Sequence, residues 1–187
     1  MAAQEMAPRI GPGTRGEVGL VNWAICNALG KASGTAPPNL FTTLGRQKGL
    51  FRGWLYFAGK LMPGGKLSRR ESELVILRVA HLRGCEYEWR HHVRLGRKAG
   101  VAGHEIDLLQ GGGFDSTQGW RGRDLAILGA VDELSANQNL DDETWDNLRL
   151  HLNEPETIEL LLLVGHYQML ATTILTLRIE PDVHKDN

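Results

Sequence analysis

The sequence has few cysteines and no excess of charge of either sign. Only Cys26 and Cys85 occur among 187 residues, which excludes a disulfide-rich scaffold and a four-cysteine zinc site, although one reactive thiol remains possible. The 21 basic and 22 acidic residues are mixed along the chain, so no basic block is present to neutralise phosphates. We therefore expect no nucleic-acid partner.

The sequence also lacks the segments that direct a protein into a membrane or out of the cell. The first residues carry no long apolar core behind a positive charge, and no stretch reaches about 18 uncharged apolar residues. We therefore expect a cytoplasmic protein that has no membrane partner.

No segment alternates apolar and polar residues as a half-buried strand does, and no repeat of fixed period is found. Apolar residues three and four apart, punctuated by Gly and Pro, instead predict an all-α fold of about seven or eight helices. The fold would be a single domain over residues 14–187 behind a loose tail, residues 1–13. Helices are expected within 14–34, 39–47, 50–62, 68–83, 85–99, 121–136, 143–152 and from 155 onward, with a short turn of helix at 104–110.

Two of these helices are expected to form a central hairpin around Arg83 and Gly84. Ser68 and Glu71 have capping-box spacing before the run ESELVILRVAHL, which is apolar almost all round, as a buried helix is. Gly84 is a plausible C-cap, and the next helix begins near Cys85.

The second helix of the hairpin carries an unusual stripe of side chains. Cys85, Glu88, Trp89 and His92 are spaced i, i+3, i+4 and i+7 and therefore share one face. A thiol, a carboxylate and an imidazole beside an indole are typical of a partly buried polar pocket with an aromatic wall. Glu73, in the preceding apolar helix, needs a partner if it is buried, and the hairpin can bring it to His92 or Cys85.

In an alternative interpretation, the same residues have only structural roles and catalyse no reaction. The stripe then fills the core or forms ordinary surface pairs, and Glu73 pairs with Arg69 or Arg78 of its own helix. A metal site is not expected, because the adjacent His91 and His92 point about 100° apart on a helix.

Three further residues are candidates for substrate binding. Arg78 would clamp a substrate carboxylate bidentately, or else neutralise Glu73. Trp89 would form a wall of the pocket. His166, with the adjacent Tyr167 in the apolar run IELLLLVGHYQMLATTIL, would reach a pocket between helices, or else be a satisfied core histidine.

The central stretch LSRRESELVILRVAHLRGCEYEWRHHVRLGRKAGVAGHEIDLL resembles proteins of the carboxymuconolactone decarboxylase family. Similar features are the Glu in the first helix, the Leu-Arg-Val-Ala stretch, and Tyr-Glu-Trp followed by a spaced His. The resemblance extends over nearly the whole chain after residue 35. It implies an all-α fold like that of alkylhydroperoxidase D, a site held by the two central helices, no organic cofactor, and a homo-oligomer such as a dimer, trimer or hexamer.

The resemblance implies two kinds of chemistry. In the alkylhydroperoxidase D branch, a C-x-x-C pair, a Glu and a His relay protons during peroxide reduction. Glu73, Cys85 and His92 match those positions, but Glu88 replaces the second cysteine, so a dithiol cycle within the motif is impossible. Cys26 would resolve an oxidised Cys85 only if the fold placed the two thiols together.

In the decarboxylase branch, carbon dioxide is removed from a carboxylated muconolactone. Glu88 and His92 would act there as acid and base, Glu73 would support them, and Cys85 would be a wall or auxiliary proton donor. We predict a cofactor-independent decarboxylation or related proton transfer on a small carboxylated lactone. The alternatives are a thiol peroxidase that uses Cys85 and a non-catalytic helical binding module.

Overall fold

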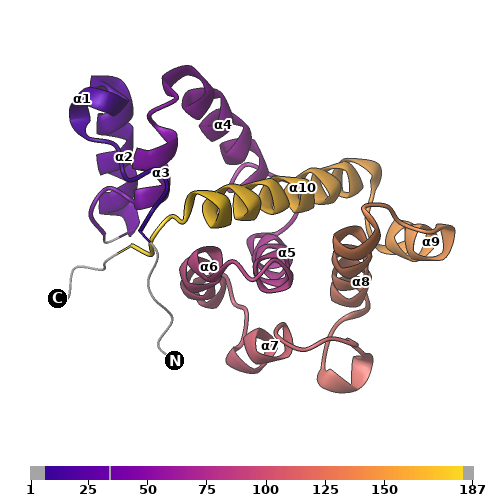
Figure 1. Ribbon diagram of the computed structural model, residues 1–187. Coiled ribbons are helices and arrows are strands. Elements are labelled where there is room, and N and C mark those ends of the chain that lie inside the picture. The colour runs from indigo at the N-terminus through magenta and orange to yellow at the C-terminus, as the bar shows by residue number, and fades with distance from the viewer. Residues whose placement is uncertain (1–6, 34, 183–187) are drawn as a thin grey trace. The chain divides into compact units, whose positions relative to one another are not determined.

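The computed structural model describes residues 7–33 and 35–182, and every regular element in these ranges is a helix (Figure 1). The all-α prediction is therefore confirmed. Contacts divide the chain into two compact units, residues 1–58 with 173–187 and residues 59–172. A single domain over residues 14–187 stays a prediction.

The first unit contains α1 (Arg15–Val18), α2 (Leu20–Ser33), α3 (Asn39–Leu44) and most of α4 (Lys48–Leu61). Thr14 and Glu17 form a capping box, in which the Thr14 backbone N–H donates to the Glu17 carboxylate at 2.8 Å. The box begins a separate single-turn helix, because Gly19 adopts φ 81° and interrupts the helical path before α2.

Part of the predicted loose tail is held in place in this unit. The Arg9 backbone N–H donates to the Leu177 carbonyl at 2.9 Å, and the Gly13 N–H donates to the Thr42 carbonyl at 3.2 Å. The Arg46 Nε donates to the Gly11 carbonyl at 3.1 Å. Residues 9–13 are therefore anchored, whereas residues 1–6 of the predicted tail lie outside the described residues.

The second unit holds the end of α4 and most of the remaining helices. These are α5 (Arg69–Leu82), α6 (Glu86–Lys98), α7 (Gly103–Leu108), the 3₁₀ turn η1 (Ser116–Gln118), α8 (Gly122–Asn137), α9 (Asp142–His151) and α10 (Glu154–Leu177), whose last turn belongs to the first unit. Helix α5 packs against α6 on one side and α8 on the other (Figure 1). Its core cluster consists of Leu74, Leu77, Val101, Ile106, Leu109, Trp120 and Leu128.

The predicted central hairpin is present as α5 and α6. The Glu71 backbone N–H donates to the Ser68 hydroxyl at 3.2 Å, and the Ser68 N–H donates to the Glu71 carboxylate at 2.8 Å, so the capping box forms as expected. After α5, Gly84 takes φ 61° and the Cys85 N–H donates back to the Ala80 carbonyl at 2.8 Å. This left-handed turn reverses the chain and places Cys85 at the first residue before α6.

Helix α10 is the one helix in the described residues that is long and apolar enough, by length and composition, to cross a membrane. Its mean hydropathy is 1.6, and 44% of the tested window is buried. Leu160, Leu163 and Ala171 are fully buried, as they would be in a core helix, which passes the same test. The absence of a membrane partner stays a prediction.

Candidate active site

The four residues predicted to carry chemistry all lie buried on the central hairpin. Glu73 is in the second turn of α5, and Cys85 is the residue that precedes α6. Glu88 and His92 follow on the same side of α6, one and two turns later. The hairpin therefore brings together a thiol, two carboxyl groups and an imidazole that the sequence separates by up to 19 residues.

Glu73 is fully buried and is shared between two partners. Its Oε2 lies 2.8 Å from Nδ1 of His92, and its Oε1 lies 2.7 Å from Nη2 of Arg69. His92 was one of the two partners predicted for it, and Arg69 was one of the two arginines in the structural interpretation, so features of both hold at once. A carboxylate on Nδ1 favours the tautomer whose Nε2 carries the lone pair, which is the form of imidazole that accepts a proton.

Cys85 and Glu88 are buried side by side, and burial favours the protonated, uncharged form of each. Burial raises the pKa of the Cys85 thiol to about 12, and the charge of Glu88 acts in the same direction. The backbone N–H groups of Glu88 and Tyr87 oppose this shift without reversing it. Burial also raises the pKa of Glu88 to about 8, with the nearby Cys85 thiol a weaker opposing influence. Near neutral pH both groups therefore hold their protons.

Tyr167 of α10 completes the cluster and is the residue that sequence reasoning placed least well. Its ring meets the His92 ring at 5.2 Å between centroids and 87° between planes. Burial, followed by the charges of Glu73 and Glu88, holds the pKa of its phenol well above the usual value. Its position beside His166 in a long apolar run was the only sequence signal, because no spacing rule relates α10 to the hairpin.

Arg78 is held by structural contacts, and its acidic partner is Asp132, whereas the expected partner was Glu73. Its Nε and Nη2 donate to the Asp132 carboxylate at 2.6 and 2.9 Å. Its Nη1 donates to the carbonyls of Leu109 and Gly111 at 2.7 and 2.5 Å, and its guanidinium stacks on Phe114. Arg78 therefore neutralises Asp132 and not Glu73, and it fixes the glycine-rich loop that follows α7.

The two aromatic candidates for substrate binding lie in different surroundings. Trp89 packs against the core cluster and meets His81 at 6.0 Å between ring centroids. His166 is buried, and burial lowers its pKa to about 4, so its ring is neutral at ordinary pH. It meets Tyr167 at 5.2 Å between ring centroids and contacts the cluster through that residue. A substrate-binding role for Trp89 and His166 stays a prediction.

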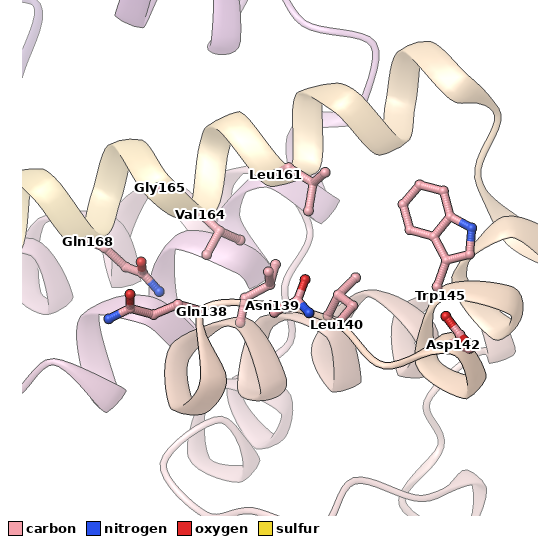
Figure 2. A pocket seen from close by; sticks show the side chains of 10 residues that line it. Gln138, Asn139, Leu140, Asp142, Trp145, Leu161, Val164, Gly165 and Gln168 are labelled. Carbon is pink, nitrogen blue, oxygen red and sulfur yellow. The ribbon is translucent and has the colours of Figure 1, made fainter.

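A pocket of about 620 Å³ lies elsewhere in the same unit, between α8, α9 and α10 (Figure 2). Figure 2 shows Gln138 and Gln168 at one end and Trp145 with Asp142 at the other, with the apolar side chains of Leu161 and Val164 of α10 between these ends. Its one carboxylate has no titratable partner among the lining residues. The buried cluster, with paired and shifted titratable groups, is the better candidate for chemistry.

The chemical capacity of the cluster follows from these protonation states. Glu88 can donate a proton near neutral pH, and His92, oriented by Glu73, can accept one. The thiol is a poor nucleophile as long as it stays protonated. Among the described residues, no group of three or more His, Cys, Asp or Glu side chains has the geometry to hold a metal ion.

Solved structures with the same arrangement of helices belong to the AhpD-like class. An uncharacterised peroxidase-related protein with an alkylhydroperoxidase AhpD core, from Ralstonia eutropha, superposes with a TM-score of 0.76 at 17% identity, covering 94% of each chain. The debrominase Bmp8 superposes with a TM-score of 0.78 at 15% identity, covering 94% of this chain and 92% of that one. A peroxidase-related protein from Silicibacter sp. gives 0.74 at 14% identity, covering 97% and 95%. These likenesses establish an AhpD-like helical fold.

A family model matches the central hairpin and the helices on either side of it. The model of the carboxymuconolactone decarboxylase family matches residues 48–113, which include Glu73, Cys85, Glu88 and His92. Comparison with curated proteins gives no match. The resemblance to the carboxymuconolactone decarboxylase family is confirmed over residues 48–113, and the fold of the chain is AhpD-like.

Proposed function

We propose that this chain is a cofactor-independent enzyme that moves protons on a small carboxylated substrate, with decarboxylation of a lactone acid as its leading reaction. The observation that carries the proposal is the burial of the Glu88 carboxyl on the same side of α6 as His92, which is itself paired with the buried Glu73 at 2.8 Å. This burial raises the pKa of Glu88 to about 8. Acid and base with separated environments in one buried cluster are typical of proton-transfer sites.

The reaction balances with the groups present. Loss of carbon dioxide breaks a carbon–carbon bond and leaves its electron pair on the substrate carbon. The neutral Glu88 carboxyl donates its proton to that carbon, and His92, which takes a proton from solvent on Nε2, then returns one to the Glu88 carboxylate. In a related isomerisation, His92 would take a proton from carbon on Nε2 while Glu88 returns one elsewhere on the substrate.

The alternative is thiol chemistry at Cys85. It is favoured by the position of the thiol at the start of α6 and by the structural neighbours, among them peroxidase-related proteins and a cysteine-to-alanine variant of Bmp8 in complex with 2,3,4-tribromopyrrole. Burial of the thiol and its raised pKa count against it, since deprotonation would have to precede attack.

One assay separates the two. Carbon dioxide release from carboxylated lactones and consumption of hydrogen peroxide are measured on wild type, Glu88→Gln, His92→Ala and Cys85→Ser. Proton-transfer chemistry predicts that the first two substitutions lower decarboxylation by about 10²–10⁴-fold while Cys85→Ser retains it. Peroxide consumption that disappears only in Cys85→Ser would support the alternative. No turnover in any protein would leave the non-catalytic binding module.

We also propose that the enzyme works as a homo-oligomer. Ile158, Leu162 and Met169 are exposed large apolar residues on one face of α10, four and seven residues apart. A contiguous apolar face of this kind is typical of a protein–protein interface, and a second copy of the chain is the proposed occupant.

A further inference from the structure

A carboxylated substrate needs a cation, and the arginine expected to supply it is occupied. Arg78 directs Nε and both Nη atoms to Asp132 and two backbone carbonyls. Arg70, also on α5, is bound to Glu105 and Asp124. The cation of α5 that touches the buried cluster is Arg69.

Arg69 connects the buried cluster to solvent. One turn before Glu73 on the same face of α5, its Nη2 lies 2.7 Å from the Glu73 Oε1. Its side chain is 38% exposed, whereas Glu73 is 0% exposed. The charge of Arg69 also acts on the phenol of Tyr167, so the guanidinium lies near both the acid–base pair and α10.

We propose that Arg69 is the anion-binding residue of the site, holding the carboxylate of a small organic acid at the solvent edge of the cluster. The inference rests on the proposed function and names its substrate class: small monocarboxylates with a reacting carbon within reach of Glu88 and His92. A guanidinium has five N–H donors in a planar fork, so Arg69 can bind a substrate carboxylate while it forms its ion pair with Glu73.

The arrangement also explains why Glu73 is shared. With Oε2 on His92 and Oε1 on Arg69, the same carboxylate links the anion-binding group to the base. An anion that draws the guanidinium away from Oε1 leaves the charge of Glu73 more fully on the imidazole. Substrate binding at Arg69 would therefore change the electrostatic environment of the His92 ring, although the two residues lie on different helices.

Binding of simple probes tests this without turnover. Benzoate and its neutral isostere benzamide are titrated into protein labelled with ¹⁵N-histidine, and the His92 ring signals are followed by NMR. Wild type should bind benzoate at least about tenfold more tightly than benzamide, because the charge-assisted bidentate contact is available only to the acid. Arg69→Gln should abolish this preference and Arg69→Lys should retain part of it.

The matched control is Arg90→Gln, because Arg90 also forms an i, i+4 ion pair, with Glu86, but both members of that pair are exposed and lie outside the buried cluster. It should bind benzoate as wild type does. Equal binding of the acid and the amide by wild type, or an unchanged preference in Arg69→Gln, would overturn the proposal. Arg69-dependent benzoate binding without decarboxylation would defeat the proposed function alone, and decarboxylation that does not depend on Arg69 would defeat this inference alone.

Discussion

The Glu73 carboxylate orients the His92 imidazole across the hairpin, with 2.8 Å between Oε2 and Nδ1. Glu73→Gln keeps the size of the side chain but removes the charge that favours the Nδ1–H tautomer. We expect kcat to fall by about 10²-fold or more while KM changes less, because the base loses its orientation. The control is Glu86→Gln, which removes a carboxylate from an exposed pair on α6 and should leave kcat unchanged. Equal kcat in wild type and Glu73→Gln would contradict the role of the pair.

The raised pKa of Glu88 makes folding stability depend on pH. The carboxyl titrates near 4.5 when unfolded and at about 8 when folded, so the folded state binds the extra proton between these values. Its contribution is fully present below about pH 4.5 and is lost as the pH rises to about 8. The difference is on the order of 5 kcal/mol, since each pKa unit is worth about 1.4 kcal/mol.

Urea unfolding between pH 5 and 9 measures this dependence. Wild type should lose stability over the window relative to Glu88→Gln, whose amide does not titrate, and the two curves should diverge up to about pH 8. Parallel curves would mean that the buried carboxyl is charged at neutral pH.

Cys85 should react slowly with thiol reagents. With a pKa raised to about 12, the thiolate fraction at pH 8 is about 10³-fold smaller than that of an unperturbed thiol with pKa near 8.5. Iodoacetamide alkylation of Cys26→Ser protein, in which Cys85 is the one remaining thiol, should be correspondingly slower than that of a free cysteine. Rapid alkylation or prompt sulfenic-acid formation would instead favour the peroxidase alternative.

Two substitutions at Tyr167 distinguish the packing of its ring from hydrogen bonding by its hydroxyl. Tyr167→Phe retains the ring that meets His92 at 5.2 Å and removes only the hydroxyl. If the phenol donates to the reacting anion, kcat should fall by about tenfold or more with little change in the free energy of unfolding. Tyr167→Leu, which also removes the ring, should lower stability by about 1 kcal/mol or more. Full activity in Tyr167→Phe would confine Tyr167 to packing.

The apolar face of α10 predicts a concentration-dependent assembly. Leu162→Glu places a charge in the middle of the face formed by Ile158, Leu162 and Met169, and should dissociate the oligomer in analytical ultracentrifugation. Leu150→Glu, on the exposed surface of α9, is the control and should leave the assembly intact. A monomeric wild type at micromolar concentration would remove this proposal.

Sequence patterns predicted those parts of the site that depend on local spacing. The capping box at Ser68 and the left-handed Gly84 place both helices of the hairpin, and the i, i+3, i+7 spacing then places Cys85, Glu88 and His92 on one side of α6. The pairing of Glu73 with His92 follows because a buried carboxylate needs a partner.

Contacts between residues far apart in the sequence could not be predicted from local spacing. Asp132 lies 54 residues from Arg78, and sequence spacing does not relate α8 to α5, so the arginine was assigned to Glu73 as its nearest acidic neighbour. Tyr167 was expected, with His166, to reach a pocket between helices, but its contact with His92 was not predicted, since α10 is apolar on most sides and its periodicity does not show which face meets the hairpin. The exposure of Trp145 likewise depends on how distant helices meet: this side chain of α9 is 41% exposed and lines the pocket between α8, α9 and α10.

The protonation state of Glu88 decides whether the site holds an acid at neutral pH. Carboxyl ¹³C signals of protein labelled at glutamate are followed from pH 4 to 10 in wild type and in Glu88→Gln, so that the signal missing from the variant identifies Glu88. The account predicts a carboxyl that titrates near pH 8, neutral and able to donate a proton at pH 7. A Glu88 signal that titrates near 4.5 would contradict it, because the site would then hold a second carboxylate and no acid.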